Sequence, residues 1–325
     1  MGRLLDINGG TGLLARFVAP ENSWLGQLAV SGGLVLGRQN FDGEAWVGVQ
    51  GGNGISRDQY AGTFFGYATL YKIIQDQPDI KKECAKRAKQ MLTYLIQNNW
   101  KVDEDRSSMA NSDTFPTVWS SIAYQKITFL VIGETMWPGL FTKELEGSSP
   151  LSGSAWVSSW LGTLDHINGY YGNNLNYIVY YNYALYEKDG ERKNKLLKSF
   201  SIKDNYLQYS INPHFDVIRA AIHPELRTLY APVIQESLQK FSHRNHRTVA
   251  PLDLDLSTIE WIDIGKVHRP RYPLDITLRR YTGQFQWERS PFAAVDEPGE
   301  GSPEVEKPGI DYTLPYWMAR YYNIL

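Results

Sequence analysis

The stretch GISRDQYAGTFFGYATLY, residues 54–71, decides the fold, because charged residues stand directly before a long apolar and aromatic run. Ser56 and Gln59 fit an S-x-x-Q capping box, in which each side chain satisfies a free backbone N–H at a helix start. This pattern predicts a helix that begins at Arg57. Its apolar side chains cover two faces, with Tyr60, Phe64, Tyr67, Tyr71 and Ile74 on one and Ala61, Phe65 and Ala68 on the other. A helix that is apolar nearly all round is buried in a protein core.

Downstream of Pro78, the sequence alternates between half-exposed and buried helices. In residues 80–100 an apolar stripe and an opposite lysine-rich face are typical of a half-exposed helix, the stripe being Ile80, Cys84, Ala88, Met91 and Leu95. Pro232 is expected to kink the last helix of the series. The further predicted helices are residues 118–137, 152–167, 173–187, 191–209, 213–222 and 225–241. Together they make four helical hairpins in which buried and amphipathic members alternate.

Three short pieces accompany this alternation, namely SRDQYAG (56–62), YLIQNNWKVDED (94–105) and YYGNNLNYIVYYNYALYE (170–187). With them, the chain over about residues 44–241 resembles the (α/α) toroid proteins of the six-hairpin glycosidase type, including uncharacterised bacterial proteins of that architecture. The resemblance implies a single all-α domain over residues 1–325, with buried helices inside a ring and amphipathic helices outside it. Because four hairpins are found rather than six, this (α/α) toroid or barrel can be complete or incomplete.

Residues 242–325 are expected to form an extended C-terminal arm that packs on the helical domain. Leu252, Leu254 and Leu256 alternate with other residues as in a strand, and strands are expected only in short pieces at the N-terminus and within residues 250–290. Segment 297–309 is an acidic loop rich in Pro, Gly and Glu. Segment 310–325 is so aromatic that we expect it to be ordered and to pack on the domain or against another subunit of a homo-oligomer.

The composition limits the classes of partner. The 325 residues carry a formal net charge of −2, which argues against a general binder of nucleic acid or of anionic membranes. The single cysteine, Cys84, excludes an intrachain disulfide but leaves the compartment open, cytoplasmic or secreted. The apolar runs are shorter than the ~20 residues of a membrane span, and residues 1–30 do not resemble a signal peptide. The 10 Trp, 21 Tyr and 12 Phe suit either a ligand pocket or the gaps between packed helices.

The sequence predicts no cofactor and no metal. It contains no P-loop, HExxH, CxxC or GxSxG motif. GGTG at 9–12 and GGNG at 51–54 lack the strand–turn–helix context of a dinucleotide site and are interpreted as turns. His243 and His246 have a spacing that suits a metal, but the basic residues around them would repel a cation.

In a toroid, the starts of the inner helices lie on one rim, and this rim is the predicted site. Asp58, Asp165 and His166 are the candidate catalytic residues. Asp58 at a helix start would stay ionised and act as a base or nucleophile, with Asp165 or His166 as the acid. Asp58 can equally serve only to complement the helix dipole. Asp113 and Asn212 share the rim with the expected substrate-binding residues, which are Trp46, Arg57, Gln59, Tyr60, Trp119, Tyr170, Tyr171, Asn173, Asn174, His214 and Asp216.

Three functions are compatible with this rim. The resemblance implies acid/base chemistry on a carbohydrate or similar polyhydroxylated ligand, as in a glycoside hydrolase, a lyase or an epimerase. The aromatic helix at 173–187 would also suit a cyclase, hydratase or isomerase acting on an apolar ligand inside the barrel. The third alternative is a non-catalytic protein that binds a ligand or serves as a scaffold. Paired ionisable groups in the real pocket would favour the first function, and an aromatic lining would favour the second.

Overall fold

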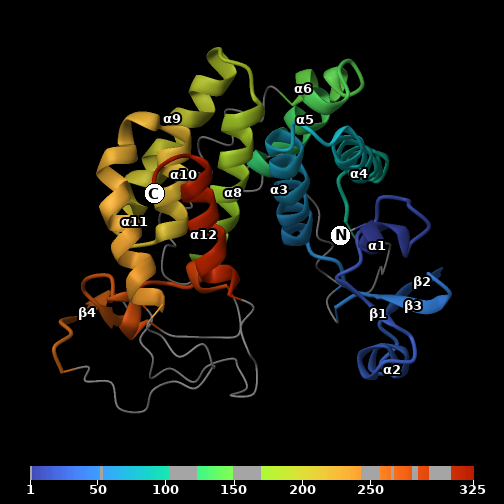
Figure 1. Ribbon diagram of the computed structural model, residues 1–325, viewed down its shortest axis with the longest axis horizontal. Coiled ribbons are helices and arrows are strands. Elements are labelled where there is room, and N and C mark those ends of the chain that lie inside the picture. Colours follow the sequence, from blue (N-terminus) through green and yellow to red (C-terminus); the bar gives the residue numbers. More distant parts are fainter. Residues whose placement is uncertain are drawn as a thin grey trace. The chain divides into compact units, whose positions relative to one another are not determined.

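The computed structural model describes residues 2–51, 54–102, 123–148, 170–242, 257–264, 267–279, 285–292 and 309–325. These residues are mostly helical, with short strands only before residue 50 and between residues 261 and 270, as predicted (Figure 1). The predicted all-α class is consistent with these helices, and the toroid stays a hypothesis. The chain divides into two compact units, Met1–Ser158 with Ile178–Leu197 (unit 1) and Ser159–Tyr177 with Lys198–Leu325 (unit 2).

Unit 1 opens with a small antiparallel sheet in the strand order β1-β3-β2. Its elements are α1 (Gly2–Asp6), β1 (Phe17–Pro20), α2 (Trp24–Ser31), β2 (Val35–Phe41) and β3 (Glu44–Val49). Asp42 and Gly43 join β2 to β3 with φ angles of 55° and 83°, the positive values that a two-residue hairpin turn needs. The predicted helical alternation from about residue 44 is therefore wrong over residues 44–49, where Val47 and Val49 form a small core with Ala29.

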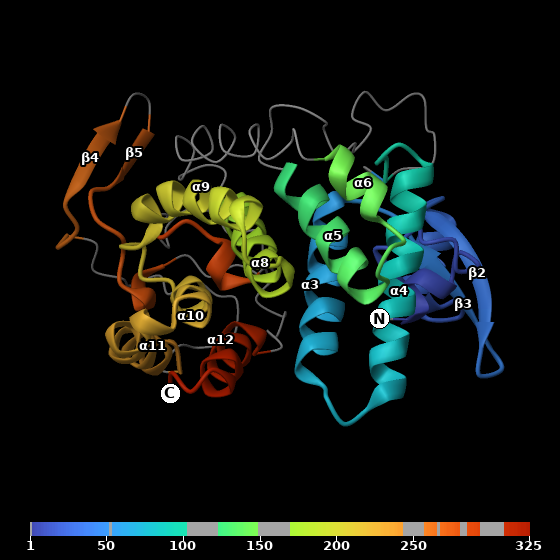
Figure 2. The same cartoon turned by 90° about the horizontal axis from the view of Figure 1, so that it is seen from above.

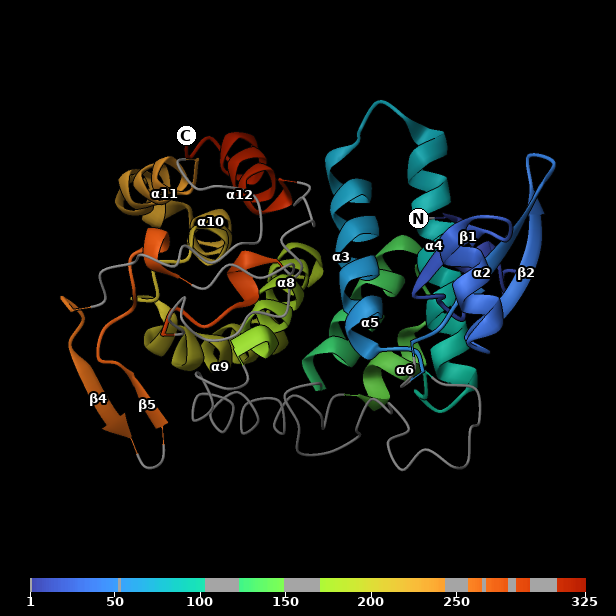
Figure 3. The same cartoon turned by 90° about the horizontal axis from the view of Figure 1, so that it is seen from below.

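The helices α3 (Arg57–Ile73) and α4 (Pro78–Gln97) form the first hairpin, beside α5 (Ala123–Met136) and α6 (Thr142–Gly147) (Figures 2 and 3). As predicted, α3 begins at Arg57, and Ser56 Oγ accepts a hydrogen bond from the N–H of Asp58 at 3.2 Å. The second half of the capping box is wrong, because Gln59 Nε2 instead donates to the carbonyl of Arg16 at 3.1 Å. The predicted apolar stripe of α4 is buried at Cys84, Ala88, Met91 and Leu95, whereas Ile80 is 37% exposed.

Helices α8 (Tyr170–Tyr186) and α9 (Glu191–Leu207) each contribute residues to both units. In unit 1, the hydroxyl of Tyr186 donates to the carbonyl of Ala68 at 2.6 Å. The ring of Tyr181 meets the ring of Phe65 edge-on, with centroids 5.7 Å apart. The aromatic residues of this half of α8 therefore pack against α3.

Unit 2 is built around α10 (Pro213–Ile222), whose residues 213–221 are all buried. Helices α11 (Arg227–Ser242) and α12 (Ile310–Tyr321) pack against it (Figures 2 and 3). The other elements are the two-stranded sheet of β4 (Trp261–Ile264) and β5 (Val267–Pro270) and the 3-10 helices η2 (Pro224–Leu226), η3 (Ile276–Leu278) and η4 (Gln286–Glu288). Leu252, Leu254 and Leu256, with their predicted strand, lie outside the described residues, as does the predicted helix 152–167.

The aromatic C-terminal segment is ordered and packs within unit 2, as predicted. The face that it buries is not the aromatic one that the sequence suggested. Helix α12 buries Asp311, Pro315, Met318 and Ala319, while Trp317 is 64% exposed and Tyr321 is 49% exposed. The helical period causes this, because residues 310, 317 and 321 lie opposite the buried positions. The carbonyl of Asp311 accepts a 2.5 Å hydrogen bond from the indole of the fully buried Trp287, which holds α12 in place.

Candidate functional site

In unit 2, three segments that are distant in the sequence meet at the N-terminal end of α10. Asn212 is the N-cap of α10, and its Oδ1 accepts a hydrogen bond from the N–H of Phe215 at 3.3 Å. Its Nδ2 donates to the hydroxyl of Tyr170, at the start of α8, at 3.3 Å and to the carbonyl of Trp287, in η4, at 2.9 Å. One buried amide therefore joins α8, α10 and η4.

These segments carry buried polar atoms that lack hydrogen bonds. They are the two ring nitrogens of His214, both amide atoms of Gln286, Asn173 Nδ2 and Asn174 Oδ1, none with a partner within the described ranges. His214 and Gln286 are 0% and 1% exposed, and the two asparagines are no more than 9% exposed. A buried polar group without a partner costs ~1–3 kcal/mol. Each of these atoms can donate a hydrogen bond to, or accept one from, a small polar molecule, water included.

His214 gives this group its chemical character. Burial lowers the pKa of His214 to about 3, so the ring is neutral near pH 7, with one nitrogen as donor and the other as acceptor. The ring of Phe285 meets the His214 ring edge-on, with centroids 5.4 Å apart. Gln286, the next residue, offers an amide donor and an amide acceptor. The unpaired atoms are therefore neutral and of both hydrogen-bonding types, and the His214 ring lies beside an aromatic ring.

Asp216 and Arg219 lie on the other side of α10, because residues two apart in a helix do not share a face. Arg219 donates to Asp216 Oδ1 and to Asp204 Oδ1, each at 2.5 Å. It also donates to the hydroxyl of Tyr177, which in turn donates to Asp204. Burial raises the pKa of Asp216 to about 6, although Arg219 opposes this shift. We call these four residues the ion cluster, in which one guanidinium faces two carboxylates.

The structure distributes the predicted rim residues over both units. Trp46, Arg57, Asp58, Gln59 and Tyr60 belong to unit 1, and Tyr170, Tyr171, Asn173, Asn174, Asn212, His214 and Asp216 belong to unit 2. Tyr170 and Asn212 meet at the start of α10, whereas Tyr171 is 55% exposed. Trp119, Asp165, His166 and Asp113 lie outside the described residues.

Two of the predicted rim residues in unit 1, Trp46 and Tyr60, contact other residues of that unit. The Arg3 guanidinium lies 4.6 Å from the ring centroid of Trp46. Tyr60 is fully buried, and its hydroxyl accepts from the N–H of Leu14 at 3.1 Å and donates to the carbonyl of Gly12 at 3.0 Å. Burial raises the pKa of this phenol. Tyr60 therefore fixes the loop before β1, and its hydroxyl is fully buried and has already donated its proton.

Replacement of Tyr60 by phenylalanine is expected to lower the free energy of unfolding by ~1–3 kcal/mol, because two buried backbone groups lose their partner. Urea denaturation followed by circular dichroism measures this loss. Tyr209→Phe is the matched control, since the Tyr209 side chain is 73% exposed, and it should change the stability by less than ~0.5 kcal/mol. Equal stabilities of the Tyr60 and Tyr209 variants would contradict the assignment.

Sequence reasoning missed Gln286, Asp204, Tyr177 and Arg219. Asp216 and Arg219 are three residues apart on a predicted helix, and this spacing is a readable signal for an ion pair. Gln286 offers no such signal, because η4 joins the site only through tertiary contacts.

Comparisons of the chain with protein-family models, with curated proteins and with solved structures gave no match. None of the helices in the described ranges is both long and apolar enough to cross a membrane. No three His, Cys, Asp or Glu side chains within those ranges gather closely enough to hold a metal ion. The functional argument therefore rests on the chemistry of the unit 2 site.

Proposed function

We propose that unit 2 binds a small, neutral, polyhydroxylated molecule where α8, α10 and η4 meet. The observation that carries the proposal is the set of unpaired buried atoms of His214, Gln286, Asn173 and Asn174. A ligand that paired with them would recover most of the cost of their burial. Binding sites of this kind combine a mostly apolar wall with a few placed polar groups.

The hydrogen-bonding types favour a hydroxylated ligand over a charged one. A hydroxyl group both donates and accepts, which matches the neutral imidazole of His214 and the amide of Gln286. The unpaired side-chain atoms here carry no charge, and a charged ligand that found no charged partner among them would be expensive to bury. The apolar C–H surfaces of a sugar would lie against rings such as Phe285, which contacts His214.

A second candidate is an acid/base enzyme that acts on the same class of ligand, with its reacting groups on the side of α10 opposite His214. The observation in its favour is Asp216, whose pKa of about 6 allows proton exchange near neutrality, beside the second carboxylate of Asp204. The resemblance to toroid glycosidases points to the same substrate class, and glycoside hydrolysis needs two carboxyl groups. The prediction that Asp58, Asp165 and His166 perform acid/base chemistry is a separate hypothesis, which does not involve Asp216 or Asp204.

The binding proposal is tested with a panel of neutral mono- and disaccharides and polyols in calorimetric titrations and thermal shift measurements. We expect saturable binding by at least one of them. His214→Phe and Gln286→Leu should abolish it without loss of stability, because each change removes unpaired buried polar atoms. His223→Phe, with a side chain 39% exposed, is the matched control and should bind normally.

Two results would contradict the binding proposal. The first is the absence of binding by every neutral compound of the panel. The second is a high-resolution crystal structure in which ordered waters pair with His214 and Gln286 and no ligand displaces them. For the enzyme candidate, Asp216→Asn should abolish turnover of a sugar but leave binding at His214 and Gln286 within ~3-fold, a change of less than ~1 kcal/mol.

A further inference from the structure

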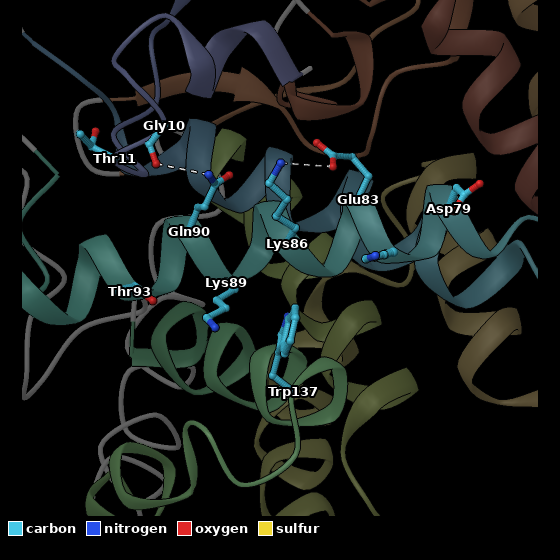
Figure 4. Close-up of a pocket in the computed structure, with 10 residues that line it drawn as sticks. Gly10, Thr11, Asp79, Glu83, Lys86, Lys89, Gln90, Thr93 and Trp137 are labelled. Carbon is cyan, nitrogen blue, oxygen red and sulfur yellow. Dashed lines mark hydrogen bonds and ion pairs between the residues drawn. The ribbon is translucent and has the colours of Figure 1, made fainter.

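We propose that a cleft along α4 in unit 1 binds a small multivalent oxyanion, such as a phosphate ester or a polycarboxylate. The cleft has a volume of about 740 Å³, which is in the range of small-molecule sites. Figure 4 shows the outer face of α4 as its floor, with Gly10 and Thr11 on one side and Trp137 on the other.

The glycine-rich loop GGTG, residues 9–12, builds the first wall. Gly12 has a φ of 101°, and a Cβ atom at this position would lie 2.2 Å from the carbonyl oxygen of Gln90. Gln90 Nε2 donates to the carbonyl of Gly10 at 3.3 Å. The loop is thus pressed against α4 and held there by a side chain that itself lines the cleft.

Trp137 builds the second wall. Its indole N–H donates to the carbonyl of Ala85 at 2.8 Å, which fixes the ring against α4. The ammonium of Lys89 lies 4.7 Å from the centroid of the ring. This cation–π contact holds the charge of Lys89 at the cleft without neutralising it.

Three lysines of α4, Lys82, Lys86 and Lys89, line the cleft. In the described part of the chain, Lys82 and Lys89 have no carboxylate within 4.0 Å. Lys86 lies 3.7 Å from Glu83, whose other oxygen accepts a 2.5 Å hydrogen bond from Arg87. Glu83 is therefore shared between two cations and compensates Lys86 only in part.

The charge arrangement selects the ligand. Like charges at neighbouring helix positions repel one another, and an anion between Lys86 and Lys89 would relieve this repulsion. Asp79 lies at the far end of the row in Figure 4, so the positive part of the cleft extends from Lys86 toward Thr93. The amide of Gln90 and the hydroxyl of Thr93 can add hydrogen bonds there. An anion with two or more charges is attracted more strongly than chloride.

The proposal is tested by calorimetric titration of the full chain with pyrophosphate and with citrate at an ionic strength of ~20 mM, where screening is weak. We expect saturable binding by one or both anions. The double variant Lys86→Gln, Lys89→Gln should weaken it by ~10-fold or more, because the charge-assisted hydrogen bonds to the two ammonium groups are lost. Preference for pyrophosphate would identify a phosphate site, and preference for citrate a carboxylate site.

The matched control is the double variant Lys193→Gln, Lys195→Gln, which removes two charges from α9 in the same unit. Each of these lysines already pairs with a carboxylate four residues earlier, Asp189 at 2.9 Å and Glu191 at 2.7 Å. The control should bind the anion as the unaltered protein does. An equal loss in both double variants would reduce the binding to a general charge effect and overturn the proposal. Lack of saturable binding by both anions would also overturn it, and neither result bears on the site in unit 2.

Discussion

Replacement of Arg219 by methionine is expected to lower the free energy of unfolding by ~3–5 kcal/mol at pH 7. Arg219 is 2% exposed and is the only cation that the structure places within 4.0 Å of Asp216 and Asp204 in the described residues. Its removal takes the hydrogen-bond donor and the compensating positive charge from two carboxylates, and it takes a donor from the hydroxyl of Tyr177. A buried charge without compensation destabilises the protein far more than the loss of an exposed ion pair does. Chemical denaturation followed by fluorescence measures the loss.

The loss should depend on pH with a defined sign. Without Arg219, burial favours the protonated carboxyl groups still more, so the folded variant binds protons that the unfolded chain releases. The variant should therefore lose the most stability above about pH 6, the pKa of Asp216 in the unaltered protein, and recover part of it near pH 4. The control Arg271→Met breaks an exposed pair with Glu260 and should cost less than ~1 kcal/mol. A loss at Arg219 as small as that of the control would show that the ion cluster is not a stabilising unit.

Acidification is expected to destabilise the protein through His214. The pKa of this buried ring is about 3 in the folded protein, against an ordinary value of 6.5. Below pH 6.5 the unfolded chain therefore takes up a proton that the folded chain refuses. The contribution is complete above pH 6.5 and is lost toward pH 3 at ~1.4 kcal/mol per pH unit, or ~2–3 kcal/mol by pH 4.5.

The variant His214→Phe isolates this effect. The difference in stability between the unaltered protein and the variant should change by ~2–3 kcal/mol between pH 7 and pH 4.5, and His223→Phe is the control at an exposed histidine. The pH dependence of the unaltered protein alone does not isolate His214, because Asp216 changes the free energy of unfolding with pH in the opposite direction. The stability of the variant must therefore be compared with that of the unaltered protein at each pH. Its raised pKa gives stability at low pH that is lost as the pH rises through about 6. Identical slopes for the two variants would contradict a neutral, buried His214.

Helix limits were predictable where a local signal sets them. Asn212 and Pro213 are an N-cap and a first-turn proline, and α10 spans residues 213–222 as predicted. Ser56 fixes the start of α3 in the same way. Tertiary contacts decided the rest. Gln59 bonds a distant carbonyl in place of its own helix start, and α12 buries Asp311 while Trp317 faces out.

For the candidate site, too, the sequence indicated the residues at helix starts but not those that only tertiary contacts bring in. The reasoning that polar residues gather at helix starts selected Tyr170, Asn173, Asn174 and His214, four residues of the unit 2 segments that meet at α10. It could not select Gln286, because a short 3-10 helix has no periodicity to read. It also could not separate Asp58 from Asp216, since both stand in the first turn of a helix and only the burial of Asp216 distinguishes them.

The GGTG loop also sets unequal limits on how its own sequence can change. All of its glycines have a positive φ, but the space beside them differs. A Cβ atom would have open space at position 9 and would contact the movable end of the Gln90 side chain at position 10. At position 12 it would collide with the backbone of α4. Asparagine adopts such φ angles more readily than other residues and can therefore occupy position 9. No rotamer change can make room at position 12. In an evolving lineage, the first glycine of the motif is free to drift while the last is fixed, although the sequence presents them as equivalent.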